Sequence, residues 1–190
     1  MPKLHVVSMP HLEYFTDDFV LRRKSRELEK SDLNEQWFKH LINDMFETLY
    51  ADSSGIGLAA PQIGMSIRLV VIDIRRDTKK PIVLVNPTYS VLESEKASSN
   101  ETCLSVPFHS GEVMRFKKVL VNALDVNGNP IEIIGEKFLS NVLQHEIDHL
   151  DGILYIDRMD DIYKIESNLG YAATMAKKAM LSLEEGEKNK

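Results

Sequence analysis

The order of apolar and polar residues predicts a helix near the start of the chain. Residues 32–50, DLNEQWFKHLINDMFETLY, carry seven apolar side chains at helical spacing. These are Trp37, Phe38, Leu41, Ile42, Met45, Phe46 and Leu49. Asp32 and Glu35 have the spacing of a capping box at its start. One amphipathic helix is therefore predicted here, followed by an irregular loop over residues 53–64, SSGIGLAAPQIG, because glycine and proline interrupt regular elements.

The middle of the chain has the composition of strands. Apolar and β-branched residues dominate residues 67–74, 81–93 and 118–135. Within the last range, Asn127-Gly128 lies between alternating apolar residues and predicts a hairpin turn with two positive φ angles. Few helices separate these strands, so we expect a largely antiparallel sheet.

The period becomes helical again from Glu136, and Gly152 is placed to end this second helix. A further helix is predicted within residues 160–183, followed by a frayed polar tail, EEGEKNK. The predicted fold is α+β, with mostly antiparallel sheets packed around a central helix and with a C-terminal helix.

Composition narrows the class of protein. The 190 residues fit one domain with an ordinary hydrophobic content of 43%, and the net charge of −6 disfavours a broad nucleic-acid site. No apolar run approaches the roughly 20 residues of a membrane span, and the N-terminus lacks a secretory core, so we expect a cytoplasmic protein without a membrane partner. The single cysteine, Cys103, cannot form an intramolecular disulfide, which leaves packing, reactivity or metal ligation.

The second predicted helix carries QHEIDHLDG, residues 144–152. His145 and His149 are four residues apart and point the same way, and Glu146 lies about 60° further round, within reach of a water on a shared metal. This HExxH pattern is typical of metal hydrolases, although a solvated helix face with two unrelated histidines is the alternative. A catalytic site needs a third ligand and an open fourth position, and Cys103 is the one soft candidate. A lone cysteine is more often a small buried hydrophobe.

Three motifs together give a specific resemblance. GIGLAAPQIG at 55–64, ETCLS at 101–105 and QHEIDHLDG at 144–152 occur in the same order and at similar separations as in peptide deformylases. The chain resembles this family from Met1 to about Asp160. The resemblance implies a catalytic domain over residues 1–160, with residues 161–190 forming a C-terminal helix and polar tail. It also implies removal of the formyl group from N-formylmethionine of nascent polypeptides, with release of formate.

The resemblance implies a metal ion held by Cys103, His145 and His149, with water in the fourth position. In this family the ion is typically Fe²⁺ in the cell, and Zn²⁺, Ni²⁺ or Co²⁺ are common replacements. One thiolate and two imidazoles suit zinc at least as well as iron, so ligand type alone does not select the ion.

The resemblance also assigns catalytic roles. Glu146 would take a proton from the attacking water and hand one to the departing amine. The Gln62 side chain and the backbone N–H of Leu104 would donate hydrogen bonds to the oxyanion. For Gln62, a solvated loop position is the alternative.

Substrate binding is assigned to the glycine-rich motif. Gly55, Ile56 and Gly57 would bind the extended substrate main chain, because glycine lets backbone approach closely. Ile56, Leu104 and Val142 are candidates for the pocket that takes the methionine side chain, with plain core packing as the alternative.

Supporting interactions around the ligands are also predicted. Metal-bound histidines usually donate their second ring nitrogen to an acceptor, for which Asp148 is a candidate. The resemblance also implies an ion pair between Glu101 and Arg115 behind the cysteine loop. The alternatives are a solvated Asp148 and an exposed pair.

Two residues depart from the family pattern. Thr102 stands where the family usually has glycine, and a positive φ there would strain threonine by on the order of 1 to 2 kcal/mol. Phe108 follows Pro107 where many relatives carry glycine or a charged side chain. Both departures bear on substrate preference more than on metal binding.

Two other functions are compatible with parts of the sequence. A zinc metallopeptidase would take a later His or Glu as third ligand, and only Glu166, expected on a separate helix, is available. An inactive, deformylase-like peptide-binding module would be favoured by a damaged ligand set, which this chain does not have. The expected partners are N-formylmethionyl nascent peptides and the ribosome, although the C-terminal tail carries no specific ribosome-binding sign.

Overall fold

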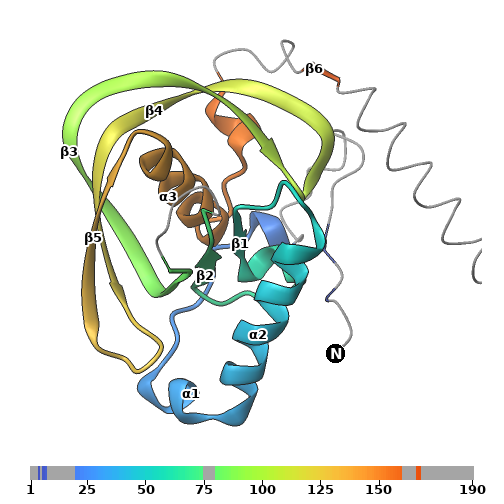
Figure 1. Cartoon of the computed structure of the whole chain (residues 1–190), viewed down its shortest axis with the longest axis vertical. Coiled ribbons are helices and arrows are strands. Elements are labelled where there is room, and N and C mark those ends of the chain that lie inside the picture. The colour runs from blue at the N-terminus through green and yellow to red at the C-terminus, as the bar shows by residue number, and fades with distance from the viewer. Residues whose placement is uncertain (1–3, 5, 8–19, 75–79, 160–165, 168–190) are drawn as a thin grey trace, which may run out of the picture.

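An antiparallel sheet wraps around one central helix in the computed structural model (Figure 1). The structure describes residues 4, 6–7, 20–74, 80–159 and 166–167. The strands are β1 Gly57–Ala59, β2 Leu69–Ile72, β3 Ile82–Cys103, β4 Val106–Leu124, β5 Pro130–Glu136 and β6 Glu166–Ser167. They pair in the order β1-β2-β3-β4-β5, β6 pairs with β4, and every pair is antiparallel. The predicted α+β fold with an antiparallel sheet is confirmed.

The helices differ from the prediction in detail. They are α1 Lys30–Asn34, α2 Gln36–Ala51 and α3 Lys137–Leu150, with short 3₁₀ turns η1 Val20–Arg22, η2 Ala60–Ile63 and η3 Tyr155–Arg158. The amphipathic helix predicted over 32–50 is confirmed as α2 for all seven of its apolar residues, but its start was wrong, because Glu35 is extended between α1 and α2. Asp32 lies inside α1, where its carboxylate accepts a hydrogen bond from the Glu29 N–H at 2.9 Å, so it does not start α2. None of the described helices has the length and apolar character that crossing a membrane requires.

The glycine-rich segment 53–64 is more regular than predicted. It contains the short strand β1 and the 3₁₀ turn η2, and the turn ends at Gly64, whose φ is +84°. Three residues are too few for alternation to reveal a strand. β1 forms because its backbone pairs with β2, as in the match of Leu58 with Val71.

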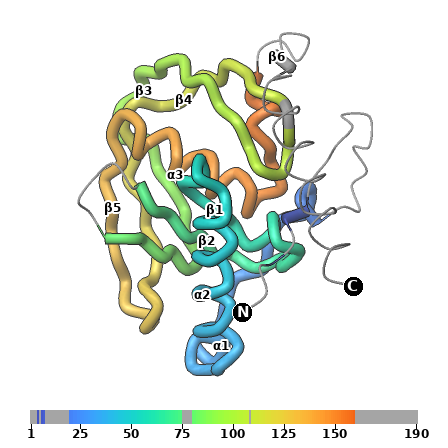
Figure 2. The backbone as a smooth tube through the Cα atoms, turned by 45° about the vertical axis from the view of Figure 1, so that its right-hand side comes forward, coloured from blue at the N-terminus to red at the C-terminus, as the bar shows by residue number. Residues whose placement is uncertain are grey.

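The strands β1 and β2 are covered on both faces, which is why β2 reads as an unbroken apolar run. Leu58 and Val71 belong to the core cluster that includes the apolar face of α2. Ala59 and Val70 point the other way, into the cluster formed with α3. Figure 1 shows β1 and β2 between α3 and α2, and Figure 2 shows the same elements turned by 45°.

The long β3–β4 hairpin extends far beyond the strand predicted over 81–93. In Figure 1 it arches over α3 and returns towards β1. Its middle part is exposed, so residues 94–100 lack the apolar alternation that marks a strand with one buried face. The tip of the hairpin carries Cys103, which is buried.

The predicted hairpin between residues 118 and 135 is confirmed as β4 and β5. Its turn type was wrong, because only Gly128 has a positive φ, of +81°, and Asn127 does not. The Gly128 N–H donates to the Asp125 carbonyl at 3.0 Å, and the Asp125 N–H donates to the Asn129 carbonyl at 2.8 Å. The loop is therefore a type I turn followed by one left-handed residue, the common three-residue hairpin.

The helix predicted from Glu136 to Gly152 is confirmed as α3. It ends because Gly152 adopts a φ of +75°, and its N–H donates to the His149 carbonyl at 3.2 Å. A Cβ at Gly152 would lie 2.6 Å from the Arg22 carbonyl oxygen, so only glycine fits. The C-terminal helix and tail expected over 160–190 lie outside the described residues, apart from Glu166 and Ser167 in β6.

Candidate metal centre

The ligand atoms of Cys103, His145 and His149 all lie within 4.8 Å of one another. Cys103 is at the end of β3, and the two histidines lie one turn apart on α3. Cys103 Sγ is 3.3 Å from His149 Nε2. Tetrahedral ligands at ordinary zinc distances are separated by about 3.5 Å, so the thiolate and imidazoles fit a single divalent ion. The tertiary fold thus brings together the three residues that the sequence proposed.

A carboxylate orients the first histidine. Glu101 Oε2 accepts a hydrogen bond from His145 Nδ1 at 2.7 Å, which leaves Nε2 of His145 free to bind a metal. Burial alone would raise the pKa of Glu101, but hydrogen bonds from Arg115 and His145 lower it to about 2. Glu101 is therefore an anion, and it favours positive charge at the site.

The two histidines have opposite electrostatic tendencies. Burial disfavours charge on His145, but contacts with Cys103 and Glu101 raise its pKa well above the usual value. Burial lowers the pKa of His149 well below the usual value, and repulsion from His145 adds to this effect. A neutral His149 beside an anionic environment suits a cation bound between these side chains.

Asp148 does not accept from either histidine, so that prediction was wrong. Its carboxylate instead binds Arg115 Nη1 at 2.5 Å and Arg158 Nη2 at 2.6 Å. Arg115 also makes a two-pronged ion pair with Glu101, with N–O distances of 2.7 and 2.9 Å. The predicted Glu101–Arg115 pair is confirmed, and it is buried rather than exposed. Arg115 thereby links the acceptor of His145 to the helix that carries it.

Glu146 is buried beside the ligands and is not one of them. A Cβ at Gly57 would lie 2.4 Å from Glu146 Oε1, so the carboxylate occupies the space next to the glycine. Its Oε2 has no hydrogen-bond partner within the described part of the chain. Burial raises the pKa of Glu146 to about 7, in the range that suits a group that both accepts and returns protons.

Gln62 is buried at the site, so its solvated alternative is wrong. Its Oε1 accepts from the Ala59 N–H at 2.8 Å, which fixes the side chain. Its Nε2 points to Cys103 Sγ at 3.6 Å and to Ser105 Oγ at 3.3 Å. The Ser105 N–H also points to Cys103 Sγ, at 3.4 Å. Two donors thus converge on the Cys103 sulfur.

A cavity of about 650 Å³ opens onto these residues. The predicted substrate-binding residues Gly55, Ile56 and Gly57 line one side of it. Leu104 and Val142, predicted for the methionine pocket, line it too. The remaining polar lining includes the catalytic candidates Gln62 and Glu146 and the candidate metal ligand His145. The cavity therefore joins an apolar surface to the ligand cluster.

The two departures from the family pattern have different outcomes. Thr102 is not among the described residues with positive φ, and it pairs with Ser110 as ordinary strand, so the strain considered for it does not arise. Phe108 lies in β4, but its side chain is outside the described part of the structure.

Glu166, the third ligand that a metallopeptidase would need, is in β6 rather than on a helix. It pairs with Ser110 of β4, and its side chain lies outside the described part of the structure. Three neighbours of the site were missed by sequence reasoning. Tyr155 stacks on His145 with ring centroids 6.2 Å apart, Arg158 binds Asp148, and His109 lines the cavity. None of them has a spacing that relates it to a motif.

Comparison with known proteins gives one family. The family model described as Polypeptide deformylase matches residues 9–164. Among curated relatives, a peptide deformylase of Finegoldia magna is 45% identical over 143 residues, which is 75% of this chain and 85% of the relative.

Solved structures give the same result. A peptide deformylase from Legionella pneumophila is 38% identical with a TM-score of 0.74, over 96% of this chain and 98% of that one. A class I type b peptide deformylase from Acinetobacter baumannii, solved with Met-Ala-Ser bound, is 30% identical. Its TM-score is 0.74, over 83% of this chain and 99% of that one.

Proposed function

We propose, from the premise that this chain belongs to the polypeptide deformylase family, that Cys103, His145 and His149 hold the metal ion of a peptide deformylase. As a member of this family the chain is a metal-dependent hydrolase that removes the formyl group from N-formylmethionine of nascent polypeptides and releases formate. The observation that carries the residue assignment is the convergence of three ligand atoms within 4.8 Å beside a buried glutamate.

The ion itself is a separate proposal. We take Fe²⁺ to be the ion in the cell, with Zn²⁺, Ni²⁺ or Co²⁺ as replacements, because of the family resemblance. The one-sulfur, two-nitrogen ligand set is compatible with each of them. When bound, the ion supplies Lewis acidity and a nucleophile at neutral pH.

Glu146 is the proposed proton carrier. Its unpaired Oε2 is available to accept a proton from the attacking water and to return it to the departing amine nitrogen. The raised pKa of about 7 supports both steps, because the carboxyl group gives up its proton as readily as it takes one. Gly57 leaves the space in which this carboxylate lies.

Gln62 and Leu104 are the proposed oxyanion donors. The Gln62 amide is held by the Ala59 N–H, so its Nε2 is already directed towards the ligand cluster. Leu104 follows Cys103 directly, and its backbone N–H is therefore adjacent to the thiolate. Fixed donors stabilise developing negative charge without reorganisation during the reaction.

The substrate main chain is proposed to bind along Gly55–Gly57. β1 is the first strand of the sheet order, so one of its edges has no strand beside it in the described part of the chain. An extended peptide can pair with such an edge, and the first side chain would then enter the cavity lined by Ile56, Leu104 and Val142. The relative with Met-Ala-Ser bound supports this class of ligand.

We also propose that residues 1–160 form the catalytic domain and that residues 161–190 form a C-terminal helix and tail. Nascent chains emerge at the ribosome, so we expect the protein to act in the cytoplasm near ribosomes.

The direct test is formate release from formyl-Met-Ala-Ser by anaerobically purified, metal-loaded protein, with acetyl-Met-Ala-Ser as the control. Stoichiometric formate from the first peptide alone is expected. Formylmethionine and Ala-Ser instead of formate would indicate a metallopeptidase, and binding without any of these products would indicate an inactive peptide-binding module.

Glu146→Gln tests the proton carrier in the same assay. The substitution keeps the size of the side chain and lies outside the ligand set, so metal content and fold should be retained. Turnover should fall by about 100-fold or more, the usual size of a general acid-base contribution. Turnover equal to that of the wild type would reject the role of Glu146.

A further inference from the structure

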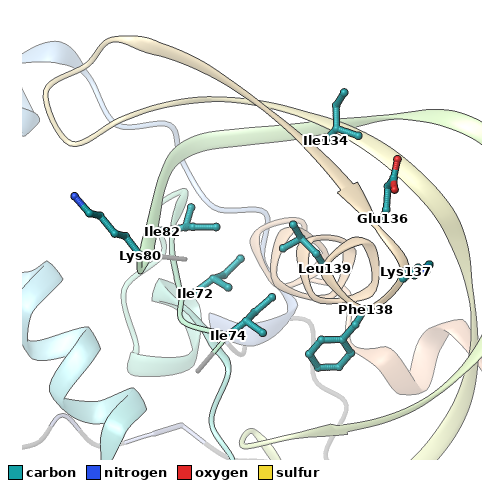
Figure 3. Close-up of a pocket in the computed structure, with 9 residues that line it drawn as sticks. All are labelled: Ile72, Ile74, Lys80, Ile82, Ile134, Glu136, Lys137, Phe138 and Leu139. Carbon is teal, nitrogen blue, oxygen red and sulfur yellow. The ribbon is translucent and has the colours of Figure 1, made fainter. Parts of the chain in front are cut away.

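A second cavity, of about 550 Å³, lies beside the start of α3. Its apolar lining comes from the ends of β2 and β5, the start of β3 and the first turn of α3. Figure 3 shows the side chains of Ile72, Ile74 and Leu139 gathered at its centre, with the Phe138 ring at its lower edge. We call this cavity the isoleucine pocket, after Ile72, Ile74, Ile82 and Ile134.

The isoleucine pocket adjoins the substrate cavity. Of the described residues that line either cavity, only Phe138 lines both. A backbone hydrogen bond also brings the linings of the two cavities together, because the Asp73 N–H donates to the Ile56 carbonyl at 2.8 Å. Ile74, the next residue, is therefore close to the glycine-rich segment on which the substrate cavity is built.

Phe138 is also in line with the metal ligands along α3. Phe138, Val142 and His145 are separated by four and then three residues, so they share one face of the helix. Phe138 is roughly 10 Å further along the helix axis than His145. A side chain that enters the cavity from the metal end therefore meets Val142 first and Phe138 last.

We propose that Phe138 sets the length of the first side chain that the enzyme accepts, by closing the substrate cavity off from the isoleucine pocket. This inference rests on the proposed function of the substrate cavity. A methionine side chain fits in front of Phe138. A longer unbranched apolar side chain requires the space behind it.

Removal of the ring should open the pocket without dismantling the fold. Phe138 is 51% exposed and belongs to none of the core clusters. Ile72, which lines the isoleucine pocket, is fully buried in the core around α3, so we expect it to keep its position when the ring is removed. The space gained is therefore bounded by apolar side chains already in place.

The test compares formyl-Met-Ala-Ser with a peptide whose first residue is 2-aminodecanoic acid, whose linear side chain is twice as long as that of methionine. In Phe138→Ala, the ratio of kcat/KM for the long peptide to kcat/KM for the methionine peptide should rise about 10-fold or more, mainly through KM. An unchanged ratio in a variant that still processes the methionine peptide would overturn the proposal.

Two further variants identify the isoleucine pocket as the cause. Phe138→Ala combined with Ile74→Trp fills the pocket and should return the ratio to the wild-type value. Ile134→Ala removes a similarly exposed side chain, 56% accessible, at the rim of the same pocket and should leave the ratio unchanged. A gain that survives Ile74→Trp, or that appears in Ile134→Ala, would contradict the assignment.

A binding measurement separates this proposal from the proposed function. Calorimetry with the two peptides lacking the formyl group should show the same selective gain for the long peptide in Phe138→Ala. If wild-type protein released no formate, the proposed function would fail, but this binding ratio would still decide the role of Phe138. Equal relative affinities in wild type and variant would reject that role.

Discussion

Gly57 has no side chain because the carboxylate of Glu146 lies where its Cβ would be. The Cβ position is 2.4 Å from Glu146 Oε1 and 2.7 Å from Cδ, so a side chain at this position would require the carboxylate to move. Its φ is not in the left-handed region, so the reason for glycine is space rather than backbone conformation. The residue that borders the substrate cavity thus also fixes the position of the proposed proton carrier.

Gly57→Ala should therefore displace the Glu146 carboxylate and lower kcat by on the order of 100-fold, because small displacements of a reacting group have effects of this size. Metal content, measured by elemental analysis, should stay at the wild-type value. The control is the same substitution in a Glu146→Gln background, where it should add little further loss. Full additivity of the two effects would show that Gly57 acts independently of Glu146.

At the residue scale, the local part of the site was predictable and the tertiary part was not. Helical spacing alone puts His145 and His149 on one face, and the three motifs together singled out Cys103. Asp148 was misassigned, because its carboxylate faces Arg115 and Arg158, and Arg158 lies beyond the helix in η3. Nothing in the spacing of Tyr155 or His109 relates them to the site.

At the element scale, a buried cluster of charges fastens the β3–β4 hairpin to α3. Glu101 is on β3, Arg115 is on β4 and Asp148 is on α3, and Arg115 binds both carboxylates. Both acids and the arginine are almost fully buried. Removal of the central cation would leave each buried carboxylate with one partner fewer, Glu101 with His145 and Asp148 with Arg158.

Arg115→Leu should lower the free energy of unfolding by about 3 to 5 kcal/mol, as measured by urea denaturation, because it removes the cation that two buried carboxylates share. The matched control is Lys117→Leu, two residues along the same strand. Lys117 pairs with Glu95 at the surface, so its loss should cost about 0 to 1 kcal/mol. Equal effects of the two substitutions would contradict the account of the cluster.

The elements themselves were predicted unevenly. α3 and the β4–β5 hairpin follow from strong local patterns. The middle of the β3–β4 hairpin is polar because it is exposed, so no apolar alternation marks it, although backbone pairing makes it a strand. β1 has only three residues, which are too few to show an alternating pattern. The extended backbone of Glu35 separates α1 from α2, and the spacing of apolar residues does not indicate this break.

At the scale of the whole molecule, the proposed metal is bound by residues from two elements that are far apart in the sequence. Cys103 comes from the tip of the β3–β4 hairpin, and His145 and His149 come from α3. An ion that binds the folded protein but not the unfolded chain stabilises the folded state by mass action. The α+β antiparallel architecture was predictable from the order of strands, whereas this junction required the three-dimensional structure.

Removal of the metal by a chelator should therefore lower the Tm. At a free ion concentration about 1,000 times the Kd, the stabilisation is about 4 kcal/mol, which corresponds to a Tm change on the order of 10 °C for a chain of this size. Cys103→Ala should lose tight binding and show little change with chelator. A Tm in the wild type that does not depend on the metal would show that the ion does not link the two elements.

The most direct measurement of the central claim is the X-ray absorption spectrum of the zinc-loaded protein, which reports the atoms bound to the ion. A first shell with one sulfur at about 2.3 Å and two imidazole nitrogens at about 2.0 to 2.1 Å is predicted. A first shell without sulfur would contradict the account, because Cys103 would then not be a ligand.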